Sequence, residues 1–206
     1  MLDEKQVKII ERNIPLLLNE GEISKDKKNE NLLSFYLENS LLSLNTAKIL
    51  NKLSSDTLLK ANFEFIDDDF ESYLWVINSS YYSMFYMAGA LLSKAGIKVK
   101  SEIGVHRKTF EALVYYFYLT KRIAKHYLEE FEAVQKESHE IMSTEEQLAA
   151  MQEKAKEIIS RYGYEMGKRA SFTYNTGKIA KSDKALTSLN RAIEFYNESL
   201  RIMDGL

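Results

Sequence analysis

The chain of 206 residues contains one proline and eight glycines, and this scarcity of helix-breaking residues constrains its fold more than any other feature. Proline and glycine interrupt helices, so their rarity favours long helices over a β-sandwich, which needs many turns. No stretch shows strand-like alternation over more than a few residues, and no segment repeats at a fixed period. The sequence therefore predicts an all-α protein, an antiparallel helical bundle with long helices.

Composition and charge narrow the class of protein further. Hydrophobic residues make up 45% of the chain, enough for a sizeable core, and the formal net charge is -2 at pH 7. Nucleic-acid binding would therefore depend on a local basic patch rather than on the whole surface. The absence of cysteine excludes disulfides and cysteine-ligated zinc or iron–sulfur sites. The N-terminus is unlike a signal peptide and residues 74–92 are too polar for a membrane span, so we expect a soluble, cytoplasmic protein.

Apolar residues at spacings of three and four predict a series of helices. One such stripe consists of Leu33, Leu37, Leu41 and Leu44, extended by Ala47 and Leu50. The expected helices cover about residues 3–20, 30–62, 70–95, 104–118, 121–140, 143–172 and 182–204. Asp3 is the expected N-cap of the first helix, and Ser182 or Asp183 that of the last. Ser143 and Glu146 fit a capping box.

Interruptions between these helices suggest how the chain is organised. Pro15 is expected to interrupt or kink the first helix, and Gly96 is a plausible left-handed C-cap for the helix that precedes it. The polar stretch over residues 21–31 is interpreted as a loop or linker. We therefore expect an N-terminal helical extension over residues 1–29 and a helical bundle over residues 30–206.

The helix expected over residues 70–95 is unusually rich in tyrosine and serine. It carries Ser79, Ser80, Tyr81, Tyr82, Ser83 and Tyr86, together with Phe85. One interpretation is a core or dimer-interface helix, whose tyrosines bury their rings and hydrogen-bond at their tips. The other is the wall of a groove in which hydroxyls and rings meet a nucleotide or an RNA base.

A second polar segment, residues 167–178 (GKRASFTYNTGK), combines cations and hydroxyls near an expected turn. Its polar side chains include Lys168, Arg169, Thr173, Tyr174, Asn175, Thr176 and Lys178. Cations and hydroxyls grouped in this way suit contact with a phosphate or an RNA backbone. A basic run at a helix end is equally an ordinary cap that opposes the helix dipole.

The three histidines do not form a recognisable metal motif. Glutamates lie near His126 and His139, but the spacing is not the Glu-x-x-His pairing of a di-iron bundle, so we interpret both histidines as solvated helix residues. No metal or cofactor is expected. His106 lies at a helix start beside Arg107 and Lys108, where it is either a local cap or part of a ligand site.

Residues 77–96 (INSSYYSMFYMAGALLSKAG), followed by residues 101–113 (SEIGVHRKTFEAL), resemble the HEPN family, the higher eukaryotes and prokaryotes nucleotide-binding domain. Residues 168–200 are similar to that family's arginine-containing helix end and closing helix. The resemblance covers about residues 30 to 204 and implies a HEPN-like bundle, usually a homodimer. It also implies binding of RNA or nucleotide, a toxin–antitoxin or defence role, and pairing with a nucleotidyltransferase-type antitoxin.

Active members of the HEPN family are metal-independent ribonucleases with an Arg-x4–6-His motif. The matching arginine is Arg169, but Tyr174 stands where the histidine is expected, and no histidine follows it. Tyrosine, with a pKa near 10, is a poor general base but can donate a hydrogen bond. The resemblance thus implies a member with a degenerate motif.

Three functional hypotheses follow from these observations. The first is an RNA or nucleotide site in which Arg169 holds phosphate; the other expected site residues are Ser80, Tyr81, His106, Lys168, Tyr174 and Asn175. The second is a non-catalytic module that pairs with a nucleotidyltransferase-type protein. The third is a metal-independent ribonuclease in which Arg169 and Tyr174 act with His106 as a proton shuttle.

Overall fold

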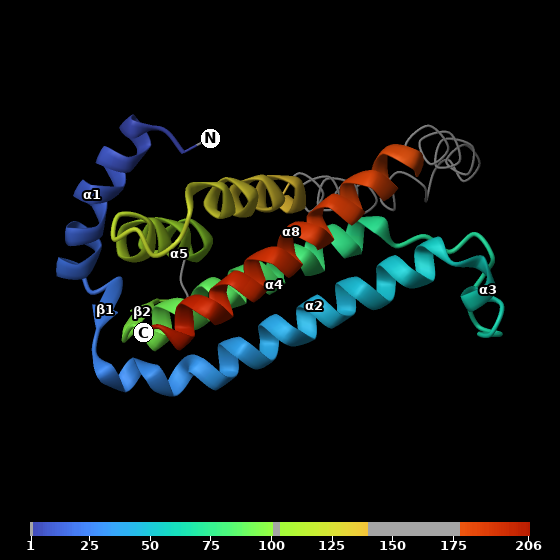
Figure 1. The fold of residues 1–206 in the computed structure, drawn as a ribbon, viewed down its shortest axis with the longest axis horizontal. Helices are drawn as coiled ribbons and strands as arrows, with labels where there is room; N and C mark the ends of the chain where they lie inside the picture. The colour runs from blue at the N-terminus through green and yellow to red at the C-terminus, as the bar shows by residue number, and fades with distance from the viewer. Residues whose placement is uncertain (1, 101–103, 140–177) are drawn as a thin grey trace, which may run out of the picture.

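Three long helices lie side by side along the length of the molecule (Figure 1): α2 (Leu33–Ser55), α4 (Tyr73–Lys94) and α8 (Lys178–Asp204). A further helix over residues 125–139 lies above them in this view, and in chain order these helices alternate in direction. They belong to a computed structural model that describes residues 2–100, 104–139 and 178–206. The predicted all-α helical bundle is confirmed.

Helix α4 forms the centre of the bundle because its sequence is almost free of charge. Lys94, in the last turn, is its single charged residue, and 15 of its 22 residues are buried. It packs against α2 on one side and α8 on another, with Met84 and Met87 fully enclosed. A helix that is apolar around most of its circumference is expected to be surrounded by others.

Close contact between α2 and α4 depends on a glycine and two serines. A Cβ atom added to Gly89 would lie 2.7 Å from ring carbons of Tyr36, so only glycine lets this ring approach the α4 backbone. Nearby, the Ser40 hydroxyl donates to the Ser83 carbonyl over 2.8 Å. The two serines are fully buried, and the bond satisfies groups that would otherwise destabilise the core.

The apolar stripe predicted on α2 faces the core only in part. Leu44 and Ala47 are buried, and Leu33, Leu37 and Leu50 are partly buried against the same cluster. Leu41, the remaining leucine of the stripe, is 44% exposed.

Helix α1 (Glu4–Asn19) stands across one end of the bundle (Figure 1). Asp3 is its N-cap, as predicted, and forms a capping box with Gln6. The helix runs through Pro15 as one element, so the predicted interruption there is wrong. Ile10 and Ile14 point into the same core that α4 fills, and this burial attaches α1 to the bundle.

Residues 21–31 are more ordered than the predicted loop or linker. They contain strand β1 (Ile23–Lys25) and the 3-10 helix η1 (Lys27–Leu32), which begins after the N-cap Asp26. β1 pairs antiparallel with β2 (Ile97–Val99), with Ser24 opposite Lys98. The prediction failed because the partner strand is more than 70 residues away, and pairing at that separation leaves no local signal.

Gly96 links this small sheet to α4. Its φ of +72° is the left-handed conformation expected of a C-cap glycine, which confirms the prediction. Its carbonyl accepts from the Asp26 amide at 2.8 Å and from the Asn29 side chain at 3.0 Å. The end of α4 and the segment after α1 are therefore joined.

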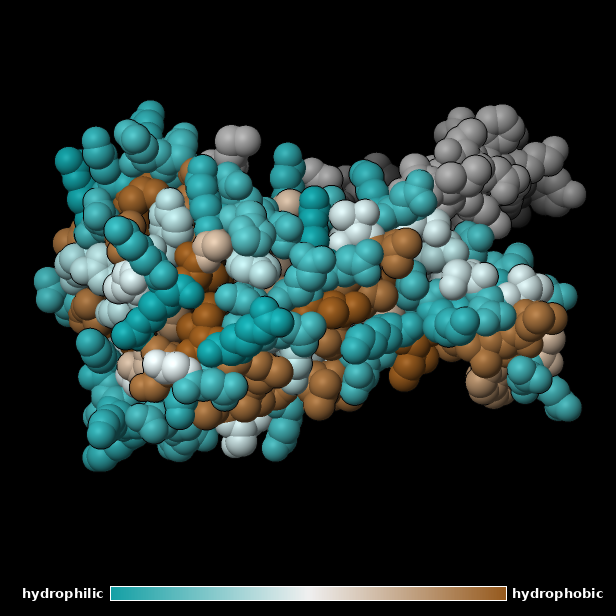
Figure 2. Space-filling view, viewed as in Figure 1, coloured by the Kyte–Doolittle hydropathy of each residue, from teal (hydrophilic) through white to brown (hydrophobic). Residues whose placement is uncertain are grey.

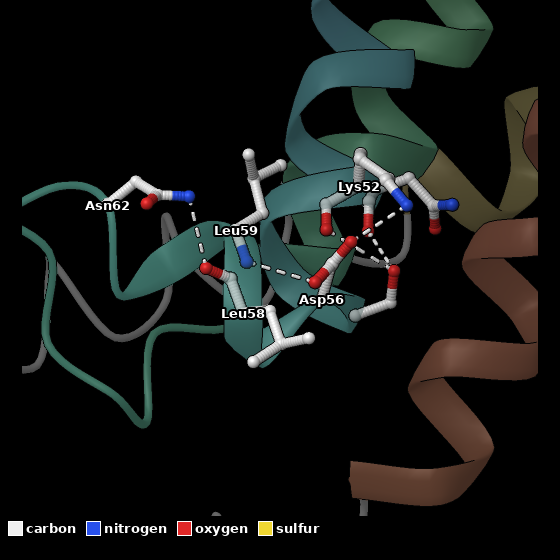
Figure 3. A network of polar contacts seen from close by, with 7 residues as sticks. Lys52, Asp56, Leu58, Leu59 and Asn62 are labelled. Atoms are coloured by element: carbon white, nitrogen blue, oxygen red, sulfur yellow. Dashed lines mark hydrogen bonds and ion pairs between the residues drawn. The ribbon is translucent and has the colours of Figure 1, made fainter.

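At the other end of α2, a short helix, α3 (Thr57–Lys60), begins with the acidic cap Asp56 (Figure 3). Its carboxylate accepts from the Leu59 amide at 3.0 Å and pairs with Lys52 at 2.8 Å. Lys60 is buried and donates to the carbonyls of Asp68 and Phe70, which fixes the acidic turn that precedes α4.

The chain after β2 forms α5 (Val105–Leu113), which continues as one π-helical segment, η2 (Val114–Tyr118). The predicted helix over residues 121–140 begins only at residue 125, because Lys121 has a φ of +60° and a turn precedes the helix. The Asn78 carboxamide oxygen accepts from the Ser138 hydroxyl at 2.7 Å and so connects α4 to this helix.

Helix α8 begins at Lys178, four residues before the predicted start at 182. Ser182 and Asp183 therefore lie inside the helix, and their prediction as N-caps is wrong. The capping box of Ser143 and Glu146 and the turn over residues 173–178 lie wholly or mainly outside the described residues. Within the described ranges, no helix has both the length and the apolar run that crossing a membrane requires.

Candidate functional site

The first turn of α5 has no side-chain cap and carries basic side chains. It begins at Gly104, whose φ is +80° and which supplies no side chain to cap the helix. His106, Arg107 and Lys108 follow, and no acidic residue lies in this turn. Positive charge at a helix N-terminus opposes the helix dipole, whereas an anion there is favoured. A negatively charged ligand at this helix start would therefore be stabilised by both the dipole and the basic side chains.

His106 is held in place by Tyr81 from the central helix. The Tyr81 hydroxyl oxygen and Nδ1 of His106 are 2.7 Å apart, while the tyrosine side chain is buried and the histidine half-buried. Burial above all, with a smaller effect of Tyr82, raises the pKa of Tyr81, so its phenol keeps its proton. Which of the two atoms donates depends on the tautomer of His106. We expect the hydroxyl to donate to Nδ1, which leaves the proton of the neutral imidazole on Nε2.

A second histidine, His139, lies against this pair from the helix over residues 125–139. Its ring centroid is 5.8 Å from that of His106 and 5.7 Å from that of Tyr81. His139 is exposed, whereas His106 is half-buried, so the two imidazoles occupy different environments. The interpretation of His139 as a solvated helix residue missed its neighbours, because 33 residues separate it from His106.

Aromatic rings enclose the buried side of His106. Phe85 lies closest, with ring centroids 4.4 Å apart, and Tyr82 lies at 6.1 Å. Burial, and to a lesser degree His139, lower the pKa of His106. His106 is therefore neutral at pH 7 and can accept a proton, which is what a general base near neutral pH requires.

Ion pairs surround the next residues of α5. Arg107 pairs with the nearly buried Glu111 at 2.8 Å, and Lys108 pairs with Glu22, which follows α1. The hydrogen bond that Glu22 accepts from Lys108 lowers the pKa of Glu22 more than any other interaction does. Both cations thus have carboxylate partners among the described residues.

Two hollows lie between α1 and α5 and share Arg107 and Glu111. One, of about 330 Å³, is lined by residues such as Asn13, Glu20 and Lys108. The other, of about 270 Å³, extends to Glu132 and Gln135 beside the histidine cluster. Their walls combine both signs of charge, and both are open to solvent.

The expected site residues fall into two groups. Ser80, Tyr81 and His106 are described: Ser80 is fully buried with no hydrogen bond to its hydroxyl among the described residues, and Tyr81 bonds to His106. With 1% exposure, Tyr81 acts on a ligand only by positioning His106. The remaining expected site residues lie outside the described ranges; they are Lys168, Arg169, Tyr174 and Asn175.

Among the described residues, no group of three or more histidine or acidic side chains is arranged to hold a metal ion. Comparison of the chain with known proteins gives no match to a family model, to a curated protein or to a solved structure. The resemblance to the HEPN family therefore remains a prediction from the residues. What the arrangement itself offers is two adjacent imidazoles of different exposure beside an uncapped helix N-terminus.

Proposed function

We propose that this protein is a HEPN-like helical protein that binds RNA or a nucleotide through a phosphate group beside His106 and His139. The observation that carries the proposal is the bond from Tyr81 to His106 at the start of α5, with the exposed His139 next to it. The proposal extends the predicted composite site by one residue, His139. Arg169 remains its expected phosphate ligand.

The local chemistry favours an anionic ligand. Nε2 of His106 is a hydrogen-bond donor when it carries the proton of the neutral ring, and the exposed imidazole of His139 can donate to a phosphate oxygen. The α5 N-terminus, whose N-cap Gly104 makes no side-chain hydrogen bond, adds a favourable dipole. Tyrosine rings at the rim, including the half-buried Tyr82, suit stacking against an unpaired base.

Binding of a fluorescein-labelled single-stranded RNA, measured by anisotropy, tests the proposal. His139→Ala and Arg169→Ala are each expected to weaken binding at least about tenfold, as loss of a charge-assisted phosphate contact does. His126→Ala is the matched control, because His126 is exposed on the same helix but lies away from the cluster. Equal affinity of the parent and both variants would contradict the proposal, as would a complex only with a nucleotidyltransferase-type protein.

A metal-independent ribonuclease is the second candidate, and the difference between the two histidines favours it. When Nδ1–H of His106 donates to the Tyr81 oxygen, Nε2 of the neutral ring is free to take the proton of a ribose 2′-hydroxyl. His139 in its protonated form can then give a proton to the leaving oxygen. This arrangement supplies the imidazole that the degenerate motif lacks after Arg169. Tyr81 is a positioning residue in this reaction because it fixes which nitrogen of His106 carries the proton.

Incubation with transfer RNA in the presence of a chelator tests the second candidate. A ribonuclease of this kind gives a bell-shaped dependence of rate on pH, set by the two histidines. His106→Ala and His139→Ala are each expected to reduce the rate at least about a hundredfold, and His126→Ala to leave it unchanged. Cleavage at the parent rate by the first two variants would assign the activity to a contaminant.

A further inference from the structure

His106 and His139 bring two imidazole rings together from different helices, and we call these two residues the histidine pair. Imidazole nitrogen is a preferred ligand of Zn²⁺, Ni²⁺ and Cu²⁺, whereas Mg²⁺ and Ca²⁺ prefer oxygen. Figure 2 shows mainly hydrophilic surface at the end of the molecule where α1 stands, beside α5. His139 is exposed and His106 half-buried, so a hydrated ion can approach the pair from solvent.

We propose that the histidine pair is a reversible binding site for Zn²⁺ or a similar divalent transition-metal ion, whose remaining coordination positions are filled by water. The spacing of residues along single helices predicted no metal site, because the pair is formed only when α5 packs beside the helix over residues 125–139. The proposal goes beyond the proposed RNA site and does not rest on it, since metal binding is measured without RNA.

The distance between the two rings fits a shared ion. With a bond of about 2.1 Å from nitrogen to zinc, the ion lies about 3.2 Å from the centroid of each ligand ring, so the two centroids can be at most about 6.4 Å apart. At a tetrahedral angle their separation is about 5.2 Å. The centroids of His106 and His139 are 5.8 Å apart, so a closure of less than about 1 Å gives tetrahedral geometry.

One of the two rings is fixed and the other can adjust. The ring planes meet at 83° in an edge-to-face arrangement, so one imidazole must turn before both nitrogens reach the same ion. His106 is held by Tyr81 over 2.7 Å. The His139 side chain is exposed, so its side-chain torsions can change between rotamers without displacing the core. The rotation therefore falls to His139.

Tyr81 is the second hydrogen-bonding neighbour that a metal-binding histidine usually has. When Nε2 of His106 binds the ion, Nδ1 keeps the ring proton and donates it to the Tyr81 oxygen. A phenol can donate or accept, so metal binding reverses the direction that we expect for this bond without an ion and keeps the bond itself. Tyr81 is thus a positioning residue for the metal, and it does not touch the ion.

Nearby charges oppose a cation only weakly. Arg107 and Lys108 each have a carboxylate partner. The dipole at the start of α5 disfavours a cation, but an effect of that kind changes affinity by less than about tenfold. An ion held by the pair occupies nitrogens that the candidate ribonuclease needs for proton transfer, so it would inhibit that reaction.

The described residues supply two ligands, fewer than the three or four protein ligands of most zinc sites. Two ligands predict a dissociation constant on the order of ten micromolar, far weaker than that of a structural zinc site. Such an ion exchanges readily with solvent. Binding should therefore depend on the concentration of the free metal, which is why we infer a reversible site.

Calorimetric titration of the full chain, free of any polyhistidine tag, with ZnCl₂ is the first experiment. His139→Ala is expected to raise the dissociation constant at least about tenfold, and MgCl₂ should give no binding. His126→Ala is the matched control, because this exposed histidine lies away from the pair and its loss should leave binding unchanged. A parent that binds Zn²⁺ only at millimolar concentrations would overturn the proposal, as would equal affinity of the parent and His139→Ala.

The second experiment tests the geometry of the site through Tyr81. Tyr81→Phe is expected to weaken zinc binding about tenfold, as loss of a hydrogen-bonding neighbour of a ligand does, whereas Tyr82→Phe should bind as the parent does. In NMR spectra of the parent, Zn²⁺ should shift the ring signals of His106 and His139 and leave that of His126. Zinc that shifts all three histidines equally, or that binds Tyr81→Phe as tightly as the parent, would contradict the proposed site.

Discussion

The Tyr81 hydroxyl and Nδ1 of His106 share a hydrogen bond of 2.7 Å, and this contact joins the most buried helix of the described structure to the start of α5. The tyrosine is enclosed, whereas the histidine has one side toward solvent. A core side chain thereby fixes the orientation of a group at the surface. Second-neighbour support of this kind is what keeps a binding or acid–base group in one geometry.

Tyr81→Phe is expected to raise the pKa of His106. The parent hydroxyl stabilises the neutral imidazole by donating to Nδ1, and phenylalanine removes that donor while it keeps the ring. Titration of the His106 ring proton by NMR measures the change. Tyr82→Phe is the matched control, because Tyr82 lies beside the same histidine through its ring, 6.1 Å away. An unchanged His106 pKa in Tyr81→Phe would contradict the assigned direction of the bond.

The lowered pKa of His106 predicts a loss of stability on acidification. The folded state binds the second imidazole proton of His106 less tightly than the unfolded chain does, in which a histidine has a pKa near 6.5. The stabilisation that neutral His106 gives the folded state is therefore present above pH 6.5. It is lost as the pH falls through the lower pKa that His106 has in the folded state. Urea unfolding at pH 7.5 and pH 5 should show a smaller loss of stability in His106→Phe than in the parent. An equal loss of stability in the parent and in His106→Phe would show that His106 does not contribute to the pH dependence.

Gly89→Ala is expected to destabilise the protein by about 1–3 kcal/mol, the usual cost of overpacking a core. Its Cβ would lie 2.7 Å from the ring of Tyr36, so one of the two helices must move. Chemical denaturation measures the difference. In a Tyr36→Ala background the same substitution should cost much less, because the ring is gone. An equal cost in both backgrounds would place the strain elsewhere.

Glu130 is expected to reduce stability as the pH rises. Burial, and next the nearby Glu194, raise its pKa, and one of its carboxylate oxygens has no hydrogen bond among the described residues. The folded state thus favours the protonated form, and the associated stability is lost as the pH passes upward through the folded pKa. Glu130→Gln should melt at a higher temperature than the parent at pH 8, and the difference should shrink by pH 4. A difference independent of pH would exclude ionisation as the cause.

Local patterns predicted most of the helices because helix formation depends on neighbours within one or two turns. The Asp3 cap, the uncharged sequence of α4 and the left-handed Gly96 were all predicted from adjacent residues. The pairing of residues 23–25 with residues 97–99 was missed because it joins segments far apart in the chain. The exposure of Leu41 could not be predicted, because helical periodicity gives a stripe but not its width.

The candidate site could be predicted only in part for the same reason. His106 was selected from its position at a helix start, and Tyr81 from an aromatic helix that is too polar for a simple core. Their direct contact, and the position of His139 beside them, depend on how three helices pack. The histidine expected after Arg169 is absent from that part of the sequence, and no local pattern indicates that two others lie together elsewhere.

The chain has only three histidines, so one NMR titration tests the central claim directly. A short single-stranded RNA is added to the full chain while the ring-proton signals of His106, His126 and His139 are followed. The account predicts that the signals of His106 and His139 shift with the same saturation curve and that His126 stays in place. RNA that binds without shifting His106 and His139, or that shifts all three equally, would contradict the proposed site.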